Sequence, residues 1–252
     1  MLAYAAAAPA TFTYEFSDTS GFSIQGGAIG EIRASITGAG TAELSYAPAA
    51  NGIGLTVSLT DFAGSFTNSA AGGTTTASAA DVQGAAQLNL SSRGEVTVTT
   101  LPTVSRAAQM VGVGPNFFRR FTLRLPGQRM QRGATWVDTV AVTEETAGTK
   151  AAVRDIVSAT WVRVTIVAGR TLTVITHSTQ RTLDISGTSE GVEIAQHLAG
   201  TASGETLWDA ERNVIVSRIE TTDLSGTFDL PAMGISGLPV EAAGTGRITL
   251  RQ

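Results

Sequence analysis

Residues 31–66 read EIRASITGAGTAELSYAPAANGIGLTVSLTDFAGSF, and residues 193–228 read EIAQHLAGTASGETLWDAERNVIVSRIETTDLSGTF. Aligned without a gap at an offset of 162 residues, the two stretches share ten identities in 36 positions. Tyr46 also falls on Trp208, so the aromatic spacing agrees as well. This match predicts an internal duplication. Two copies so far apart do not suit a solenoid or a propeller, whose period is roughly 20 to 50 residues.

Alternating polar and apolar residues recur along the chain, which is the pattern of half-buried β-strands. The clearest runs are 11–16, 54–59, 95–98, 121–125 and 161–167. Glycine-containing turn signals separate them at intervals typical of antiparallel hairpins. The best helix candidates are 104–110 and 149–158. We therefore expect an all-β fold of antiparallel strands in two related β-units with few or no helices. The units are either sandwich-like or parts of one continuous curved sheet.

One motif occurs in both copies, as Thr-Asp-Phe-Ala-Gly-Ser-Phe at 60–66 and Thr-Asp-Leu-Ser-Gly-Thr-Phe at 222–228. An aspartate that bonds a nearby N–H, followed by a glycine, is typical of a turn or a bulge. We interpret the motif in that structural sense. One carboxylate per copy is a poor site for Ca²⁺, so no metal is expected at Asp61 or Asp223.

Basic residues are concentrated between the copies. Residues 1–105 carry 2 basic and 7 acidic residues, 106–132 carry 6 and 0, and 133–252 carry 9 and 14. We divide the chain into an N-terminal segment at 1–10, a first β-unit at 11–105, a basic and aromatic connecting segment at 106–132, and a second β-unit at 133–252.

The first ten residues, MLAYAAAAPA, are small and apolar, as at the cleavage end of a secretory signal peptide, but they lack its charged start. They are either the remnant of such a peptide or an ordered apolar arm. We favour export, and expect a periplasmic or otherwise extracytoplasmic protein peripheral to a membrane. No run approaches the ~18 to 20 apolar residues of a spanning helix.

Composition excludes several classes of function. With no Cys and two His, the chain offers no thiol nucleophile, no Fe–S cluster and no zinc ribbon. Its net charge of -4 gives no reason to expect a nucleic-acid partner. It has no P-loop or dinucleotide fingerprint. We therefore expect no cofactor and no metal.

Three sets of residues resemble catalytic groups and are better explained as structure. The string Gly-Thr-Ser-Glu-Gly at 187–191 matches G-x-S-x-G, yet no helix is expected after it. His177 and His197 are expected on neighbouring strands, where they can share a face, but two histidines do not make a zinc site. The pairs Glu144–Glu145 and Asp209 with Glu211 are interpreted as solvated turns. We therefore predict no catalytic residue and no enzyme.

The connecting segment mixes arginine with aromatic and methionine side chains, a combination enriched at the centres of protein interfaces. The predicted partner-binding residues are Arg106, Phe117, Phe118, Arg119, Arg120, Phe121, Arg124, Arg129 and Arg132. The expected partner is another protein, such as a membrane complex, and the same arginines suit a peripheral contact with anionic headgroups. The plain alternative is a strand pair with solvated arginines.

A resemblance adds to this reading. Leu125-Pro126-Gly127 and the following Gly133-Ala-Thr-Trp136-Val-Asp138 resemble a signature of uncharacterised, exported, β-rich bacterial proteins, and 200–209 is similar to their later strands. The resemblance covers about residues 120–252. It implies a secreted β protein and no particular activity. Exported β proteins of this size include membrane-extrinsic subunits of large complexes, among them photosynthetic reaction-centre and antenna assemblies.

Three hypotheses follow. The first is a non-catalytic extracytoplasmic scaffold or docking subunit that binds and stabilises a larger membrane complex. The second is a periplasmic carrier of a lipid or another apolar ligand, favoured by abundant Ala and Gly at strand positions if these leave volume unfilled. The third is a structural protein of a phage.

Overall fold

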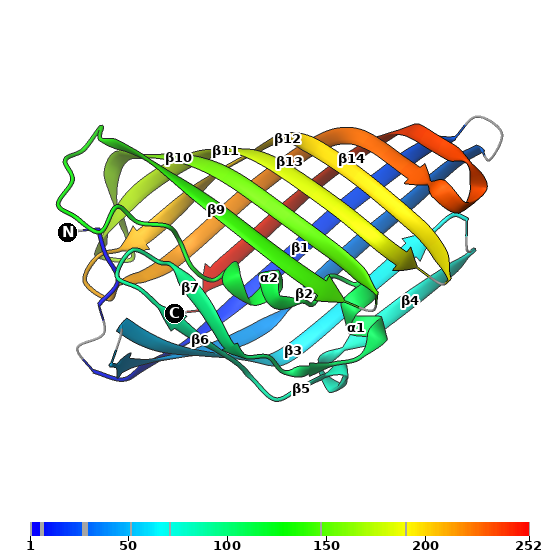
Figure 1. The fold of residues 1–252 in the computed structure, drawn as a ribbon. Helices are drawn as coiled ribbons and strands as arrows, with labels where there is room; N and C mark the ends of the chain where they lie inside the picture. The colour runs from blue at the N-terminus through cyan, green and yellow to red at the C-terminus, as the bar shows by residue number, and fades with distance from the viewer. Residues whose placement is uncertain are drawn as a thin grey trace.

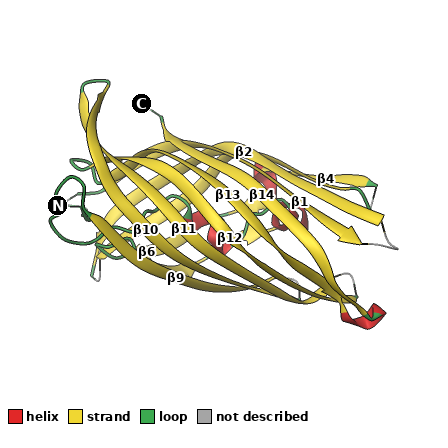
Figure 2. Cartoon of the chain, turned by 90° about the horizontal axis from the view of Figure 1, so that it is seen from above, coloured by secondary structure: helices red, strands yellow, loops and turns green. Residues whose placement is uncertain are grey.

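The computed structural model describes residues 2–5, 8–26, 30–50, 52–70, 72–146, 148–189 and 191–251. Twelve strands form one antiparallel sheet in the order β7-β6-β3-β2-β1-β14-β13-β12-β11-β10-β9, with β4 pairing on β3. Two further strands, β5 and β8, form a small second sheet. The main sheet curls into a half-barrel, and α1 and α2 lie on its hollow side (Figures 1 and 2).

The elements have the following bounds. The long strands are β1 (Ala10–Gly26), β2 (Gly30–Ala49), β3 (Gly52–Asn68), β9 (Thr135–Thr146), β10 (Thr149–Val167), β11 (Arg170–Ser189), β12 (Val192–Asp209), β13 (Val214–Leu230) and β14 (Ile235–Leu250). The short strands are β4 (Gly73–Ser78), β5 (Val82–Gln83), β6 (Ala86–Leu90), β7 (Val96–Thr100) and β8 (Thr103–Val104). The helical elements are η2 (Ala79–Asp81), α1 (Arg106–Met110), α2 (Pro115–Arg119) and η3 (Pro231–Met233).

The predicted all-β fold is confirmed, and of its two forms the continuous curved sheet is the one found. Strands β1 and β14 pair from Tyr14 with Leu250 to Ile24 with Val240, so they join the first and last parts of the chain. The helix expected at 104–110 is present as α1, whereas 149–158 lies within β10. The run at 121–125 is irregular rather than a strand, because it covers the sheet instead of extending it.

The two matching stretches form equivalent hairpins. Strand β2 begins at Gly30 and β12 at Val192, which is the 162-residue offset, and β3 and β13 begin at Gly52 and Val214 with the same offset. Next to β3 lies β6, and next to β13 lies β14, so each copy continues to the terminal strand with which it shares sequence. The meanders β1-β2-β3-β6 and β11-β12-β13-β14 therefore follow one another around the half-barrel, head to tail, and meet where β1 pairs with β14.

Tight curvature demands small residues on the inner face of this sheet. A Cβ on Gly40 would lie 2.2 Å from the carbonyl oxygen of Asp61, and a Cβ on Gly200 would lie 2.1 Å from that of Asp223. Real side chains do not approach backbone so closely. Asp61 and Asp223 are equivalent at the 162-residue offset, so the same close approach occurs once in each copy.

The repeated motif that contains these aspartates is not a turn, so that part of our interpretation is wrong. The alternative of a bulge holds in the first copy, where Thr60 is the extra residue opposite the adjacent Thr41 and Ala42. The motif lies inside β3 and β13, where Asp61 and Asp223 are exposed while Phe62 and Leu224 face the interior. Its glycines serve close packing on the inner face. A Cβ on Gly226 would lie 1.8 Å from the carbonyl oxygen of His197.

The inner face is filled by the chain itself. We call residues 106–125 the plug, since α1, α2 and the irregular stretch after them pack into the half-barrel. Buried plug residues are Ala108, Val111, Val113, Phe117, Phe118, Phe121, Leu123 and Leu125. The ring centroid of Phe117 lies 5.2 Å from that of Phe16 on β1, and the centroid of Phe121 lies 5.9 Å from that of Tyr14. One core therefore includes both copies and the plug.

The described part of the N-terminal segment belongs to this core. Leu2, Ala3 and Tyr4 are buried, and the Tyr4 ring meets Trp208 edge-on at 4.8 Å between centroids. The Tyr4 hydroxyl accepts a hydrogen bond from the backbone N–H of Leu123 at 2.7 Å. Leu2 also bridges to Gln128. Of the two alternatives for residues 1–10, these contacts agree with an ordered arm, while Met1, Ala6 and Ala7 lie outside the described residues.

Replacing a glycine of the inner face tests the curvature. Gly40→Ala and Gly200→Ala should each lower the free energy of unfolding by roughly 2 kcal/mol or more, because the new methyl group forces the neighbouring strand away. Gly21→Ala is the control, since its Cβ would meet its nearest neighbour at an ordinary 3.5 Å. Urea unfolding measures all three. Equal stability of Gly21→Ala and Gly200→Ala would contradict the explanation.

Truncating the plug tests its place in the core. Phe117→Ala should lower the free energy of unfolding by about 3–5 kcal/mol, because it removes a buried ring and leaves a cavity among other rings. Val137→Ala is the control, since Val137 is 63% exposed and should change stability by less than about 0.5 kcal/mol. If Phe117→Ala unfolds at the same urea concentration as the control, the plug does not stabilise the sheet.

Candidate functional site

The predicted partner-binding segment is largely internal. Phe117, Phe118 and Phe121 are 5%, 1% and 1% exposed, so they cannot serve as surface anchors, and this part of the interpretation is corrected. The physical reason is that the concave sheet needs large apolar side chains to fill it, and the plug supplies them. Met130 packs partly against the same core.

The arginines of the segment divide into two groups. Arg120 forms an ion pair with Asp18 and lies over the Phe117 ring at 4.3 Å. Arg124 donates to Asp138 at 2.8 Å, with Glu95 at 3.6 Å. These two and Arg119 are held by the sheet. The exposed members of the predicted set are Arg106, Arg129 and Arg132.

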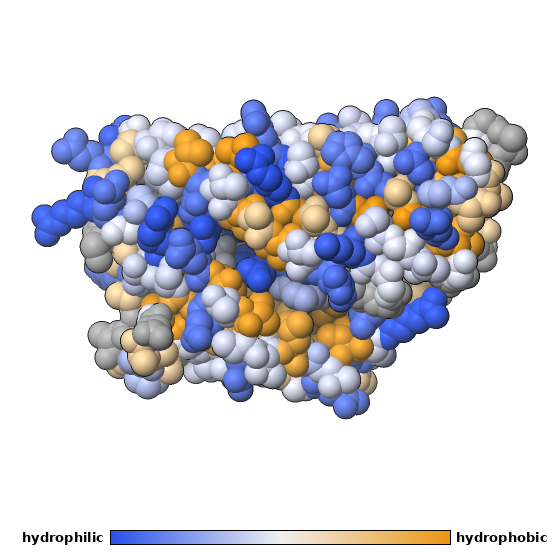
Figure 3. Space-filling view, viewed as in Figure 1, coloured by the Kyte–Doolittle hydropathy of each residue, from blue (hydrophilic) through white to orange (hydrophobic). Residues whose placement is uncertain are grey.

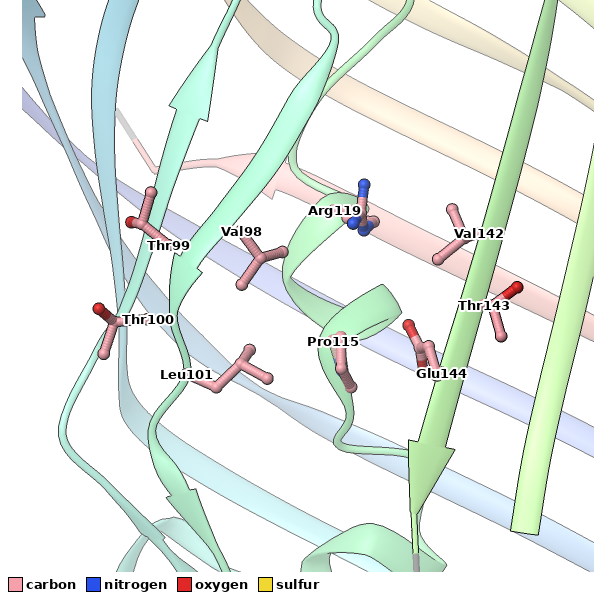
Figure 4. A pocket seen from close by; sticks show the side chains of 9 residues that line it. All are labelled: Val98, Thr99, Thr100, Leu101, Pro115, Arg119, Val142, Thr143 and Glu144. Carbon is pink, nitrogen blue, oxygen red and sulfur yellow. The ribbon is translucent and has the colours of Figure 1, made fainter.

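A hollow opens where the two ends of the sheet approach each other. Strand β7 ends the sheet on one side and β9 ends it on the other, and α2 lies between them. The hollow has a volume of about 380 Å³. It is lined by Val98, Thr99, Thr100 and Leu101 from β7 and the residue after it, Pro115 and Arg119 from α2, and Val142, Thr143 and Glu144 from β9 (Figure 4). We call it the slot.

Arg119 and Glu144 give the slot its polar character. One terminal nitrogen of Arg119, Nη1, donates to the carbonyl oxygen of Val96 on β7 at 3.0 Å. The backbone N–H of Asn116 in α2 donates to the Glu144 carboxylate. The helix is thus tied to both edges of the sheet. Meanwhile the buried Nε of Arg119 and the buried Oε1 of Glu144 have no hydrogen-bond partner.

The charges of this pair are affected by burial. Burial raises the pKa of Glu144, against the opposing effects of the Asn116 N–H and the Arg119 charge. Burial likewise lowers the pKa of Arg119. A buried polar atom without a partner is costly, and most such atoms in proteins are hydrogen-bonded to protein or to ordered water. Both unpaired atoms belong to side chains that line the slot, one on α2 and one on β9.

Sequence reasoning missed Glu144, which we had assigned to a solvated turn together with Glu145. Strand periodicity contained the signal. Glu144 is in phase with Trp136, Asp138 and Val142, which are partly buried, and out of phase with the exposed Glu145. Asp209 is a similar correction, since it is 1% exposed. It accepts the N–H groups of Glu211 and Arg212 at 3.0 Å and closes the β12–β13 turn.

The histidines lie on opposite faces of the sheet rather than sharing one. His177 is buried on the inner face, and its Nε2 lies 3.0 Å from Oε2 of Glu220. His197 is exposed on the outer face, with Nδ1 at 2.5 Å from Asp184. Within the described residues, no cluster of three or more His, Cys, Asp or Glu could hold a metal ion.

Glu220 is the centre of a partly buried ionic cluster. Besides His177 it contacts Arg218, and Arg181 at 3.7 Å, while Arg181 also makes two 2.8 Å bonds to Asp155. Burial alone would raise the pKa of Glu220, but the Arg218 charge, the His177 hydrogen bond and the Arg181 charge together hold it well below its usual range. Arg218 also donates to the carbonyl of Thr122 at 3.3 Å, so the cluster holds the plug.

The serine string at 187–191 does not form a nucleophile elbow. Gly187 and Ser189 lie at the end of β11, and β12 starts at Val192, so a hairpin stands where a nucleophile elbow needs a helix. Glu190 lies outside the described residues.

The helices in the described part of the chain are all too short to be membrane-spanning helices.

Comparisons with known proteins add no family: no protein-family model, no curated protein and no solved structure matches the chain.

The ionic cluster makes a testable prediction about pH. Because the pKa of Glu220 is lower in the folded state, its stabilisation is complete above the unfolded value of about 4.3 and is lost as the pH falls toward the folded value. Glu220→Gln leaves Arg181 and Arg218 without their shared carboxylate, and should cost roughly 1.5–3 kcal/mol at pH 7. The loss of stability between about pH 5 and pH 3 should become shallower than in the wild type.

Urea unfolding at pH 7, 5 and 3 measures this effect. Glu193→Gln, at an exposed position on β12, is the control and should follow the wild type at each pH. Parallel pH profiles for Glu220→Gln and the wild type would contradict a native-state role for this carboxylate.

Proposed function

We propose that the protein is a non-catalytic docking protein that accepts an extended segment of a protein partner into the slot between β7 and β9. The observation that carries the proposal is the unpartnered pair in the slot, Arg119 Nε and Glu144 Oε1. A peptide backbone carries both complementary groups, a carbonyl that accepts from the arginine and an N–H that donates to the carboxylate.

The edges of the sheet support the same mode of binding. Strand β9 pairs with β10 along Thr135–Thr146, and no described strand pairs with its other side. An unpaired edge is a ready template for a strand from another chain, in which backbone hydrogen bonds supply affinity and side-chain pockets supply specificity. Figure 3, drawn in the view of Figure 1, shows apolar residues beside polar ones where the plug meets the edges of the sheet.

The described structure offers less support for a carrier of apolar ligands. Abundant Gly and Ala do not leave empty volume at Gly40 or Gly200, where even a methyl group would meet backbone. The concave face is occupied by Phe117, Phe118 and Phe121. A lipid held there would have to displace these rings.

We place the partner in a membrane complex on the extracytoplasmic side, with the protein as an extrinsic subunit. This part of the proposal rests on the resemblance of residues 120–252 to exported β-rich proteins. A photosynthetic complex is one such partner.

Peptide selection tests the slot directly. A phage library of random twelve-residue peptides is selected on the wild-type protein, and binding of the chosen peptides is measured by calorimetry. Glu144→Gln and Arg119→Gln should each weaken binding about tenfold or more, because each removes a charge-assisted hydrogen bond. Glu145→Gln is the matched control on the adjacent, exposed position and should leave affinity unchanged.

Hydrogen exchange then locates the peptide. Binding should slow exchange of backbone amides in β9 between Thr139 and Glu145 and in β7. Peptides that bind Glu144→Gln and Glu145→Gln equally well, or that protect other strands, would overturn the proposal. Affinity purification from gently solubilised membranes completes the test, since a true partner should co-elute with the wild type and with Glu145→Gln but not with Glu144→Gln.

A further inference from the structure

The hairpin formed by the ends of β10 and β11 extends beyond its neighbours. Strand β9 starts at Thr135, opposite Thr160, and β12 pairs with β11 only from Thr173 onward. Past Trp161, which bonds to Gly133 and Ala134, β10 therefore pairs only with β11. Because β11 is still paired with β12 at Thr173 and Val174, the part of the hairpin without another strand beside it is residues 165–167 with residues 170–172, about 10 Å long at ~3.3 Å per residue. This hairpin lies at the end of the sheet that carries the N-terminus (Figure 2).

The β10 arm of the hairpin exposes apolar side chains. Ile166 is 73% exposed, Val164 46%, Val167 38% and Val162 37%. The β11 arm is covered, since Leu172, which pairs with Thr165, is only 1% exposed. The exposed apolar surface is therefore confined to the β10 arm and the residues next to the turn. Exposed apolar side chains beside cations are typical of proteins that bind a membrane interface.

Arginines lie on the hairpin and in the loop beside its base. Arg163 and Arg170 belong to the hairpin, and Arg132 is held beside it by a 3.2 Å hydrogen bond from its Nε to the carbonyl of Val162. Arg163 is 3.7 Å from Glu205, and Arg170 is 3.1 Å from the buried Asp209. Arg129 is exposed in the same loop as Arg132. The two segments that meet here, 96–137 and 156–183, contain no Asp or Glu.

We propose that the β10–β11 hairpin inserts its apolar tip into the surface of an anionic lipid bilayer, with Arg129, Arg132, Arg163 and Arg170 against the headgroups. Apolar side chains enter the interface and cations remain at headgroup level, as in other peripheral proteins. The surface is separate from the slot, so this inference stands or fails independently of the peptide-docking function.

Vesicle co-sedimentation of the full chain tests the proposal. Vesicles of phosphatidylcholine with 30% phosphatidylglycerol are compared with vesicles of phosphatidylcholine alone. The wild type should sediment with the anionic vesicles and should be released by salt. The double variant Val164→Ser with Ile166→Ser should bind at least tenfold more weakly, because it removes the apolar tip. Its control is Met233→Ser, which changes a residue that is 61% exposed in η3, between β13 and β14.

Charge variants separate the two contributions. Arg129→Gln and Arg132→Gln should each weaken binding roughly fivefold, while Arg154→Gln, exposed on β10 away from the tip, should have no effect. Glu144→Gln, which disables the slot, should leave vesicle binding unchanged.

Three results would overturn the proposal. They are failure of the wild type to bind anionic vesicles, binding that the tip variants do not weaken, and equal binding to neutral and anionic vesicles. Light scattering provides a further check. A dimer that Val164→Ser with Ile166→Ser dissociates, without any vesicle binding, would assign the hairpin to contact with a second copy instead.

Discussion

Close backbone packing on the inner face is the constraint on which the rest of the molecule depends. A sheet of strands up to 20 residues long can curl this tightly only where inward side chains are absent or small. Gly40, Gly200 and Gly226 meet that need, since a Cβ at any of them would come within 2.3 Å of a carbonyl oxygen. The same close approach occurs once in each copy, at the carbonyl oxygens of Asp61 and Asp223. Within the repeated motif, Gly226 meets backbone in this way, whereas its counterpart Gly64 leaves room for the side chains of Phe62 and Val111.

Curvature in turn creates a concave face that the strands cannot fill alone. The plug meets this need with three phenylalanines, and it is secured by polar contacts at several points. Arg120 pairs with Asp18 on β1, Arg218 on β13 reaches Thr122, and Arg119 reaches Val96 on β7. These contacts join the plug to strands that are far apart in the chain. Of the six arginines in residues 106–132, three (Arg119, Arg120 and Arg124) hold the plug to the sheet, and the other three are exposed.

Much of the fold could be predicted from sequence because it depends on local patterns. Alternation predicted strands, and the 162-residue match predicted the equivalence of β2 and β3 with β12 and β13. The pairing of β1 with β14, which joins the two copies into one sheet, could not be predicted, because it depends on contacts between residues more than 200 positions apart in the chain. The plug was misjudged for a related reason. Alternating Arg and Phe residues are compatible with an exposed interface and also with a segment that buries its Phe rings in a core and bonds its Arg side chains to the surrounding strands. Only the position of the sheet around the segment distinguishes the two cases.

The candidate site follows from the same geometry. An open half-barrel keeps two free edges, and the plug brings α2 between them, so polar groups that serve the helix become the lining of the slot. Glu144 bonds the Asn116 N–H with part of its carboxylate and leaves Oε1 without a partner, and Arg119 bonds Val96 and leaves Nε without one. Each of the two side chains therefore forms hydrogen bonds within the fold with only some of its polar atoms. Two unpaired buried atoms therefore lie where the edges of the sheet approach each other, and at these edges β7 and β9 each have a side that no described strand pairs with.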